Sequence, residues 1–253
     1  GLRGLNCVFY EGPGGADRVF GALLECLGML PRQRRVFLSY KRSEATPVAV
    51  QLFAELSARH YDVFLDTHSI GAGVDFQENL WHSLCDVDVL VMLDSPQYFE
   101  SRWTAAEYGR ALAKGIGVLR VQWPTAQASQ ITGTSSLVAL NLSDFRQDNS
   151  LEAKALDLVC DQLEDFRSLA HATRHLSIVG AVEEAVSRIH GRVEGMDAYR
   201  AMQVRLRSGK RLIVQPTVGI PTAVTLQQAL QRAGECEAAI VYDHVGILPS
   251  WLA

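Results

Sequence analysis

Short apolar segments alternate with longer helical patterns through the middle of this chain, and this alternation restricts the fold more than any other feature. The apolar segments are residues 36–40, 62–66, 88–93 and 116–121. The third is apolar enough to be covered on both faces of a sheet. Strands alternating with helices of this length predict an α/β fold, a parallel sheet with helices on both faces. The helix after the first strand is expected to direct inward Val50, Phe53, Ala54 and Leu56.

Weaker α/β patterns flank this central segment. The four expected parts are a strand–helix unit of another module at 1–31, the central domain at 32–125, a linker with an amphipathic helix at 126–175, and a second, smaller α/β module at 176–253. We interpret residues 124–150 mostly as connection and 151–170 as the amphipathic helix. A separate helix is expected at 182–190, and Ser208-Gly209 predicts a hairpin turn. The first and last parts can form one module around the central domain.

Composition excludes several classes of function. Lys and Arg total 24 against 28 Asp and Glu, a net charge of −4, so no broad nucleic-acid-binding face is expected. No apolar run reaches the ~18 residues of a membrane-spanning helix. The five cysteines are odd in number and widely spaced, without a Cys-x-x-Cys pair. This usage predicts reduced thiols in a cytoplasmic protein, with neither a disulfide framework nor a metal site.

Five ordered motifs carry the strongest functional signal. The chain reads Val-Phe-Leu-Ser-Tyr-Lys-Arg at 36–42, Val-Phe-Leu-Asp at 63–66, Ile-Gly-Ala-Gly at 70–73 with Phe76, an apolar strand at 88–93 followed by Ser95, and Ser-Arg-Trp-Thr-Ala-Ala-Glu at 101–107. In order and spacing these motifs resemble those of TIR (Toll/interleukin-1 receptor) domains, including the Ser-x-Trp-x-x-x-Glu segment. The resemblance covers about a third of the chain. It implies a flavodoxin-like TIR domain at 32–125.

The resemblance also implies an enzyme that consumes NAD+. Many bacterial, plant and animal TIR domains cleave the nicotinamide–ribose bond, and their catalytic glutamate corresponds to Glu107. The products are nicotinamide and ADP-ribose or its cyclic form. NAD+ is the substrate, so no cofactor is expected. The residues expected to bind it are Ser39, Tyr40, Arg42, Asp66, Ile70, Gly71, Gly73, Phe76, Ser95 and Trp103.

Assembly is a further implication of the resemblance. In the family, the loop after the second strand gates the pocket and docks onto a neighbouring TIR domain, so that assembly activates the enzyme. Gly71 and Gly73 give this loop conformational freedom. Similarity to bacterial members implies an immune or anti-phage effector. An activating ligand or partner is then expected on the C-terminal module.

The chemistry of this cleavage is compatible with a single carboxylate. Nicotinamide leaves a cationic pyridinium as a neutral molecule, so it needs no general acid, unlike the alkoxide of an ordinary glycoside. A carboxylate can hold ribose hydroxyls and stabilise the developing oxocarbenium ion. Trp103 and Glu107 are i and i+4, so within a helix they share a face. Arg42 follows the first strand at its carboxyl end and is a candidate phosphate contact.

Plainer interpretations stay open. Glu107 can be a solvated helix residue, Trp103 a packing residue and Arg42 part of a solvated loop. Two other functions also stay open: an adaptor that binds other TIR domains without chemistry, and a nucleoside-processing enzyme similar to deoxyribosyltransferases. His171 and His175 are i and i+4, but without a nearby acidic partner they predict an exposed helix face and not a zinc site.

Overall fold

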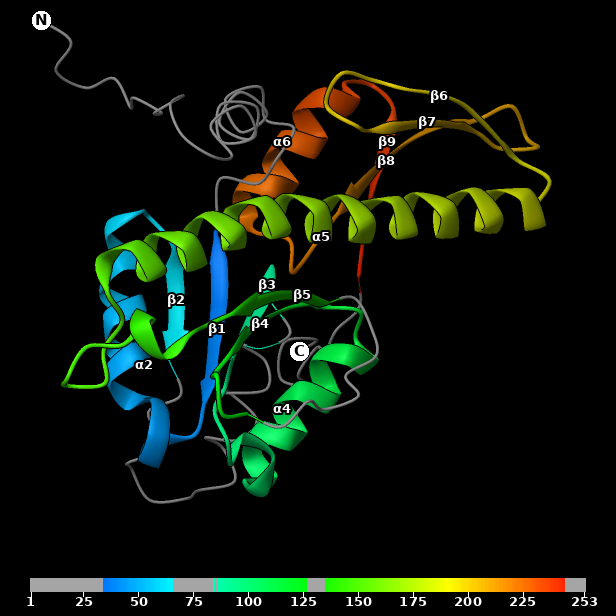
Figure 1. Ribbon diagram of the computed structural model, residues 1–253. Helices are drawn as coiled ribbons and strands as arrows, with labels where there is room; N and C mark the ends of the chain where they lie inside the picture. Colours follow the sequence, from blue (N-terminus) through cyan, green and yellow to red (C-terminus); the bar gives the residue numbers. More distant parts are fainter. Residues whose placement is uncertain (1–33, 66–83, 85, 127–134, 244–253) are drawn as a thin grey trace, which may run out of the picture. The chain divides into compact units, whose positions relative to one another are not determined.

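The computed structural model describes residues 34–65, 84, 86–126 and 135–243, and Figure 1 shows its helices and strands. The chain forms two compact units, Gly1–Leu169 and Ala170–Ala253. The strand–helix unit expected at 1–31, and its pairing with the end of the chain, lie outside the described residues. Among the helices that are described, none is both long and apolar enough to cross a membrane.

The first unit is built on a five-stranded parallel sheet with the order β2-β1-β3-β4-β5. Its strands are β1 (Arg35–Tyr40), β2 (Asp62–Leu65), β3 (Val89–Asp94), β4 (Gly117–Gln122) and β5 (Ser135–Ala139). The predicted parallel sheet is confirmed, and its strand order is that of a flavodoxin-like fold. The interpretation of 124–150 as connection is wrong at β5, which pairs with β4 along its length.

The strand order of the sheet reverses between the neighbouring strands β1 and β3. They are paired in parallel, with Ser39 opposite Met92 and Tyr40 opposite Leu93. From this pair, β2 lies beyond β1 and β4 lies beyond β3. In open α/β sheets, ligands bind outside the carboxyl ends of the strands at such a reversal. The sequence motifs that end β1 and β3 are therefore brought to the edge where a site is expected.

Helices cover both faces of this sheet, with α2 and α4 on opposite sides (Figure 1). The helical elements of the unit are α2 (Arg42–Ala58), η1 (Tyr98–Glu100), α4 (Arg102–Ala113), η2 (Leu142–Asp144) and the first part of α5 (Ala153–Arg188). Helix α2 buries Leu56 as predicted. The inward orientation predicted for Val50, Phe53 and Ala54 is wrong, because these side chains are exposed and Val48 and Leu52 are buried instead.

Helix α5 is longer than the sequence pattern predicts. One continuous helix replaces the two helices expected at 151–170 and 182–190. The segment between them contains no proline, and its single glycine, Gly180, lowers helix propensity without ending the helix. Within the first unit, α5 is fixed to α2 by Arg59, which lies 2.7 Å from Asp157 and 3.3 Å from Asp161.

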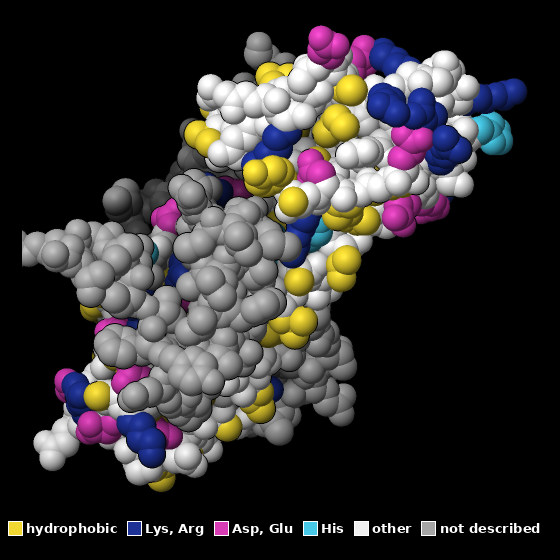
Figure 2. Space-filling model, turned by 90° about the horizontal axis from the view of Figure 1, so that it is seen from above, with side chains coloured by type: hydrophobic (Ala, Val, Ile, Leu, Met, Phe, Trp, Pro, Cys, Tyr) yellow, Lys and Arg dark blue, Asp and Glu magenta, His cyan; other side chains and the backbone are white. Residues whose placement is uncertain are grey.

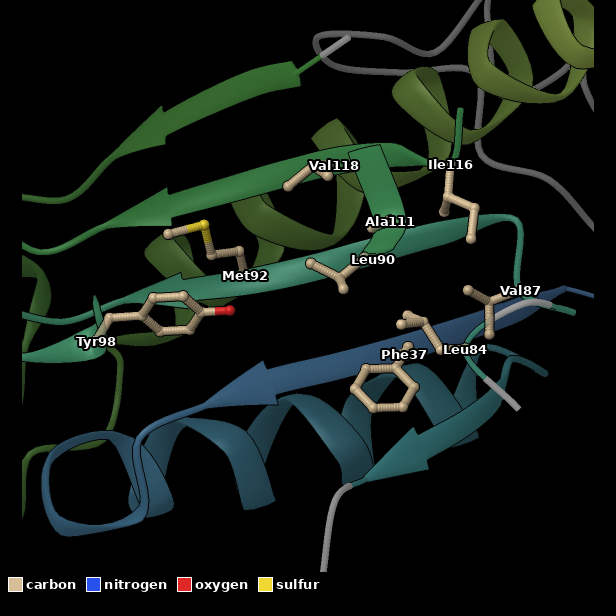
Figure 3. Packing of buried hydrophobic residues seen from close by; sticks show 9 residues of the cluster. All are labelled: Phe37, Leu84, Val87, Leu90, Met92, Tyr98, Ala111, Ile116 and Val118. Atoms are coloured by element: carbon tan, nitrogen blue, oxygen red, sulfur yellow. The ribbon is translucent and has the colours of Figure 1, made fainter. Parts of the chain in front are cut away.

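The core between the sheet and α4 is a cluster of apolar side chains (Figure 3). Phe37 of β1, Leu90 and Met92 of β3 and Val118 of β4 meet Ala111 of α4 there. Every residue of β3 is buried, as expected for a strand covered on both faces. The ring of Tyr98 lies in the same cluster beside Met92. A tyrosine is therefore inserted where the core reaches the carboxyl edge of the sheet.

The second unit contains a four-stranded mixed sheet with the order β6-β7-β8-β9. Its elements are β6 (Arg192–Met196), β7 (Met202–Arg205), β8 (Arg211–Thr217), α6 (Ala223–Ala233) and β9 (Glu237–Tyr242). The predicted hairpin is confirmed, because β7 and β8 are antiparallel and Gly209 between them has a φ of +84°. Strand β9 is parallel to β8, and α6 makes the connection.

One face of this second sheet packs on the end of α5. Ile178, Val182 and Val186 of the helix contact Met202 and Val204 of β7. Oppositely charged side chains are interspersed on the surface of the described residues (Figure 2). In β6, Glu194 accepts hydrogen bonds from Arg205 at 2.6 Å and from Arg192 at 3.1 Å. Glu194 therefore joins β6 to β7 through a charged side-chain contact.

Candidate functional site

The candidate site centres on a carboxylate at the carboxyl edge of β1. Glu107 lies in α4, and its side chain is only 2% exposed. The hydroxyl of Ser39, near the end of β1, donates a hydrogen bond to Glu107 Oε2 over 2.5 Å. The interpretation of Glu107 as a solvated helix residue is therefore wrong. The two residues are far apart in sequence, and the parallel sheet with its crossover helix brings them together.

A tyrosine that sequence reasoning did not single out completes this arrangement. The hydroxyls of Tyr98 and Ser39 lie 2.6 Å apart, and Tyr98 is fully buried. Burial raises the pKa of Tyr98 well above its ordinary value, and the nearby Glu107 carboxylate raises it further. The phenol therefore stays protonated. Its sequence signal is faint: one tyrosine in the short connection between β3 and α4.

The start of α4 is held against Tyr98 by Thr104. The Thr104 hydroxyl is buried and donates to the backbone carbonyl of Tyr98. It also lies 3.1 Å from the carbonyl oxygen of Ser101, the residue before the helix. Helix α4 begins at Arg102, so Trp103 and Glu107 are both helical and one turn apart. The predicted i and i+4 relationship is therefore confirmed.

A second buried polar pair lies on the next two strands. Arg120 of β4 donates through Nε to Asp94 of β3 over 2.7 Å, and both side chains are nearly inaccessible. Burial raises the pKa of Asp94, although the Arg120 guanidinium opposes this. Ser95 follows directly and is buried, and its hydroxyl has no hydrogen-bond partner within the described part of the chain. This hydroxyl is a polar group left for a ligand or water at the edge of the sheet.

The two basic residues after β1 differ in their surroundings. Lys41 is occupied at the surface: its Nζ lies 2.7 Å from Gln97 Oε1 and 3.2 Å from Glu100 Oε2. Arg42 is the first residue of α2 and is exposed. Tyr40, by contrast, is buried at the end of β1. A role of Arg42 in phosphate binding stays a prediction.

Trp103 is half-buried, and another residue covers its ring. The guanidinium of Arg102 lies 4.6 Å from the centroid of the Trp103 ring, which is a cation–π contact. The aromatic face of Trp103, one of the residues expected to bind NAD+, therefore already carries a cation. The indole and the Glu107 carboxylate differ in exposure, since Trp103 is partly accessible and Glu107 is not.

The remaining predicted contacts lie outside the described residues. They are Asp66, Ile70, Gly71, Gly73 and Phe76. Of the residues that are described, the structure joins Ser39 to Glu107 directly and adds Tyr98. In the ranges it covers, no group of three or more His, Cys, Asp or Glu side chains is arranged to hold a metal ion. The exposed face predicted for His171 and His175 is wrong, because both are buried in the second unit.

Comparison with known proteins agrees with this geometry. No curated protein matches the chain. A family model described as a TIR domain matches residues 36–159. The match begins in β1, covers all five strands of the parallel sheet and ends within α5. The chain is therefore a TIR domain protein, with its TIR domain at residues 36–159.

Proposed function

We propose that this TIR domain cleaves NAD+ at the nicotinamide–ribose bond, with Glu107 as the catalytic carboxylate. One observation carries the proposal. The glutamate of the Trp-x-x-x-Glu segment lies at the carboxyl edge of β1, beside the β1–β3 reversal, hydrogen-bonded to Ser39 over 2.5 Å. Flavodoxin-like sheets bind their ligands at this edge.

The reaction needs little from the protein besides charge and position. The bond between ribose C1′ and the pyridinium nitrogen breaks, and its electron pair goes to nitrogen, so nicotinamide leaves neutral. The ribose carbon becomes an oxocarbenium ion. Water then adds through oxygen and releases a proton, which gives ADP-ribose. If a nitrogen of the adenine adds instead, the product is cyclic. A fixed carboxylate stabilises the positive charge at C1′ and needs no proton to do so.

Burial makes a carboxylate more effective in this role. The attraction between two charges grows as the effective dielectric falls, and the Glu107 side chain is 2% exposed. A group that is already oriented also avoids reorganisation when charge develops. Half-buried Trp103, one turn earlier in α4, supplies an aromatic surface of the kind that attracts a cationic ring.

The biological role that we propose is that of an immune or anti-phage effector, activated when TIR domains self-associate. In this proposal, the C-terminal unit senses a signal or drives assembly. Its support is the similarity of the motifs to bacterial TIR proteins, which is an analogy at the level of the family. NAD+ depletion or a nucleotide product is then the output.

A non-catalytic adaptor is the second candidate, and the same burial favours it. A carboxylate that is 2% exposed and hydrogen-bonded to Ser39 can serve to hold α4 on β1. In that case the domain acts only by binding other TIR domains. The two candidates differ in one measurable consequence, the release of nicotinamide.

The test measures NAD+ consumption and separates the products by chromatography, at high protein concentration, for the wild type and two variants. Glu107→Gln removes the charge and keeps the shape. Glu100→Gln is the matched control, because Glu100 lies nearby on η1 and its side chain is 65% exposed. We expect nicotinamide release by the wild type and Glu100→Gln and none by Glu107→Gln. Activity that survives Glu107→Gln would overturn the catalytic assignment, and no activity in any variant would indicate either an adaptor or an enzyme without its activating signal.

A further inference from the structure

The chain of hydroxyls that ends at Glu107 points to a residue that sets its orientation without touching substrate. We propose that Tyr98 is a positioning residue of this site, acting through Ser39 in a directed relay from Tyr98 OH to Ser39 Oγ to Glu107 Oε2. The importance of the relay for catalysis rests on the proposed function of Glu107. The relay itself is a property of the fold and can be tested separately.

The direction of the relay follows from counting protons. The Ser39 hydroxyl has one proton, and it donates this proton to the carboxylate. Ser39 Oγ can then only accept from its other neighbour, so the Tyr98 phenol is the donor across 2.6 Å. The backbone oxygen of Thr104 is 3.4 Å from the phenol, beyond the usual range for O–H···O bonds, and does not compete well.

The phenol is suited to act as a permanent donor. Its burial, with Glu107 and then Asp94 nearby, raises the pKa of Tyr98, so the proton is retained at physiological pH. A hydrogen bond that ends on a charged acceptor is about twice as strong as one between neutral groups. A second donor behind the first polarises it and strengthens it further. Tyr98 therefore stabilises the ionised and oriented carboxylate through Ser39.

The scaffold fixes Tyr98 at three places. Its ring packs in the apolar core beside Met92 (Figure 3), its backbone N–H donates to the carbonyl of Ser95, and its own carbonyl accepts from Thr104. The donor is thus held by the end of β3 and the start of α4. Ser39 comes from β1, so the relay links three elements of the fold at one carboxylate.

Two variants isolate the phenol hydroxyl. Tyr98→Phe removes one oxygen and keeps the ring in the core. Tyr61→Phe is the matched control, because Tyr61 is also buried and its hydroxyl also donates to a carboxylate, that of Glu164, in the same unit. Thermal unfolding of both variants verifies that they are folded. A third variant, Ser39→Ala, removes the link itself.

The first readout does not depend on activity. The side-chain carboxyl of Glu107 is followed by carbon-13 NMR in labelled protein, with its resonance assigned by its loss in Glu107→Gln. We expect Tyr98→Phe to move its titration midpoint upward by about one pH unit, and Tyr61→Phe to leave it unchanged. Ser39→Ala should raise the titration midpoint of Glu107 at least as much as Tyr98→Phe does. A variant that combines Ser39→Ala with Tyr98→Phe should show no further change, because the two residues act in series.

The second readout is kinetic. We expect Tyr98→Phe to lower kcat about tenfold with little change in KM, and the acid limb of its pH profile to move upward with the NMR midpoint. An NMR midpoint that Ser39→Ala moves and Tyr98→Phe does not would overturn the role of Tyr98. If the midpoint moves as expected but NAD+ consumption survives Glu107→Gln, the relay stands and the catalytic assignment of Glu107 fails.

Discussion

Arg167 of α5 lies fully buried, with its Nη1 3.2 Å from Asp88 Oδ2, directly before β3. Its Nη2 lies 3.5 Å from Glu164, whose other carboxylate oxygen accepts from Arg34 at 2.9 Å. This ionic network lies at the amino edge of the parallel sheet, opposite the edge that carries Glu107. It fixes the first part of α5 to the TIR domain.

Removing one member of this network is expected to be costly. Arg167→Met leaves the carboxylate of Asp88 without its fully buried ion-pair partner, so the free energy of unfolding should fall by about 3–5 kcal/mol. Arg146→Met is the control, because Arg146 pairs with Glu152 at the surface and should contribute less than about 1 kcal/mol. Urea denaturation of the two variants gives the comparison. Equal free energies of unfolding for Arg167→Met and Arg146→Met would show that the buried ion pair contributes no more than the exposed one.

The contact between Arg102 and Trp103 predicts an effect on substrate binding. If the indole takes a cationic ring, Arg102 occupies that position, and Arg102→Ala should lower the KM for NAD+ two- to fivefold by removing a competing cation–π contact of about 0.5–1 kcal/mol. Lys114→Ala removes the same charge at the exposed end of α4 and should leave KM unchanged. An increase in KM for Arg102→Ala alone would indicate that Arg102 itself binds the substrate.

His175 predicts a pH dependence of stability in the second unit. Burial lowers its pKa below 6.5, and the positive charge of Arg200 lowers it further. Below about pH 6.5, the unfolded chain therefore binds a proton that the folded unit resists, so stability falls as the pH falls. Urea midpoints at pH 7.5 and 5.5 should differ less in His175→Leu than in the wild type. The control His190→Asn, at an exposed position near the end of α5, should retain the wild-type difference.

The two described cysteines should differ in reactivity. Burial raises the pKa of the Cys160 thiol to about 12, whereas Cys236 is partly exposed. The thiolate is the reactive form, so a thiol reagent at pH 8 should modify Cys236 in the folded protein and Cys160 only after unfolding. Peptide mapping by mass spectrometry distinguishes the two sites. Rapid labelling of Cys160 under native conditions would indicate that α5 opens readily.

Four central strands could be predicted from sequence because each is a compact apolar run. Strand β5 could not, because its sequence, Ser-Ser-Leu-Val-Ala, is short and half polar, and Leu137 within it is 53% exposed at the edge of the sheet. The inward face of α2 was assigned wrongly because both of its faces carry apolar residues. Periodicity alone cannot tell whether Val48 or Val50 faces the core. The side of the helix on which the sheet lies decides this.

The candidate site could be predicted in part. The motif containing Glu107 identified the carboxylate, and its helical spacing from Trp103 was correct. Its hydrogen bond to Ser39 is a contact across distant strands and helices, which local pattern does not encode. Tyr98 was missed for a similar reason, since a buried tyrosine in a short connection is a common core residue until its hydroxyl is seen beside Ser39.

The bond between Thr104 and the carbonyl of Tyr98 also limits how this stretch of sequence can vary in length. Thr104 and Glu107 lie in the same helix, and each residue turns an α-helix by about 100°. A single insertion between them would keep the helix and its anchor at Tyr98 but rotate the carboxylate away from Ser39. Substitutions here are thus better tolerated than insertions or deletions, because the loss of one residue would turn both the carboxylate away from β1 and Ala111 away from the core.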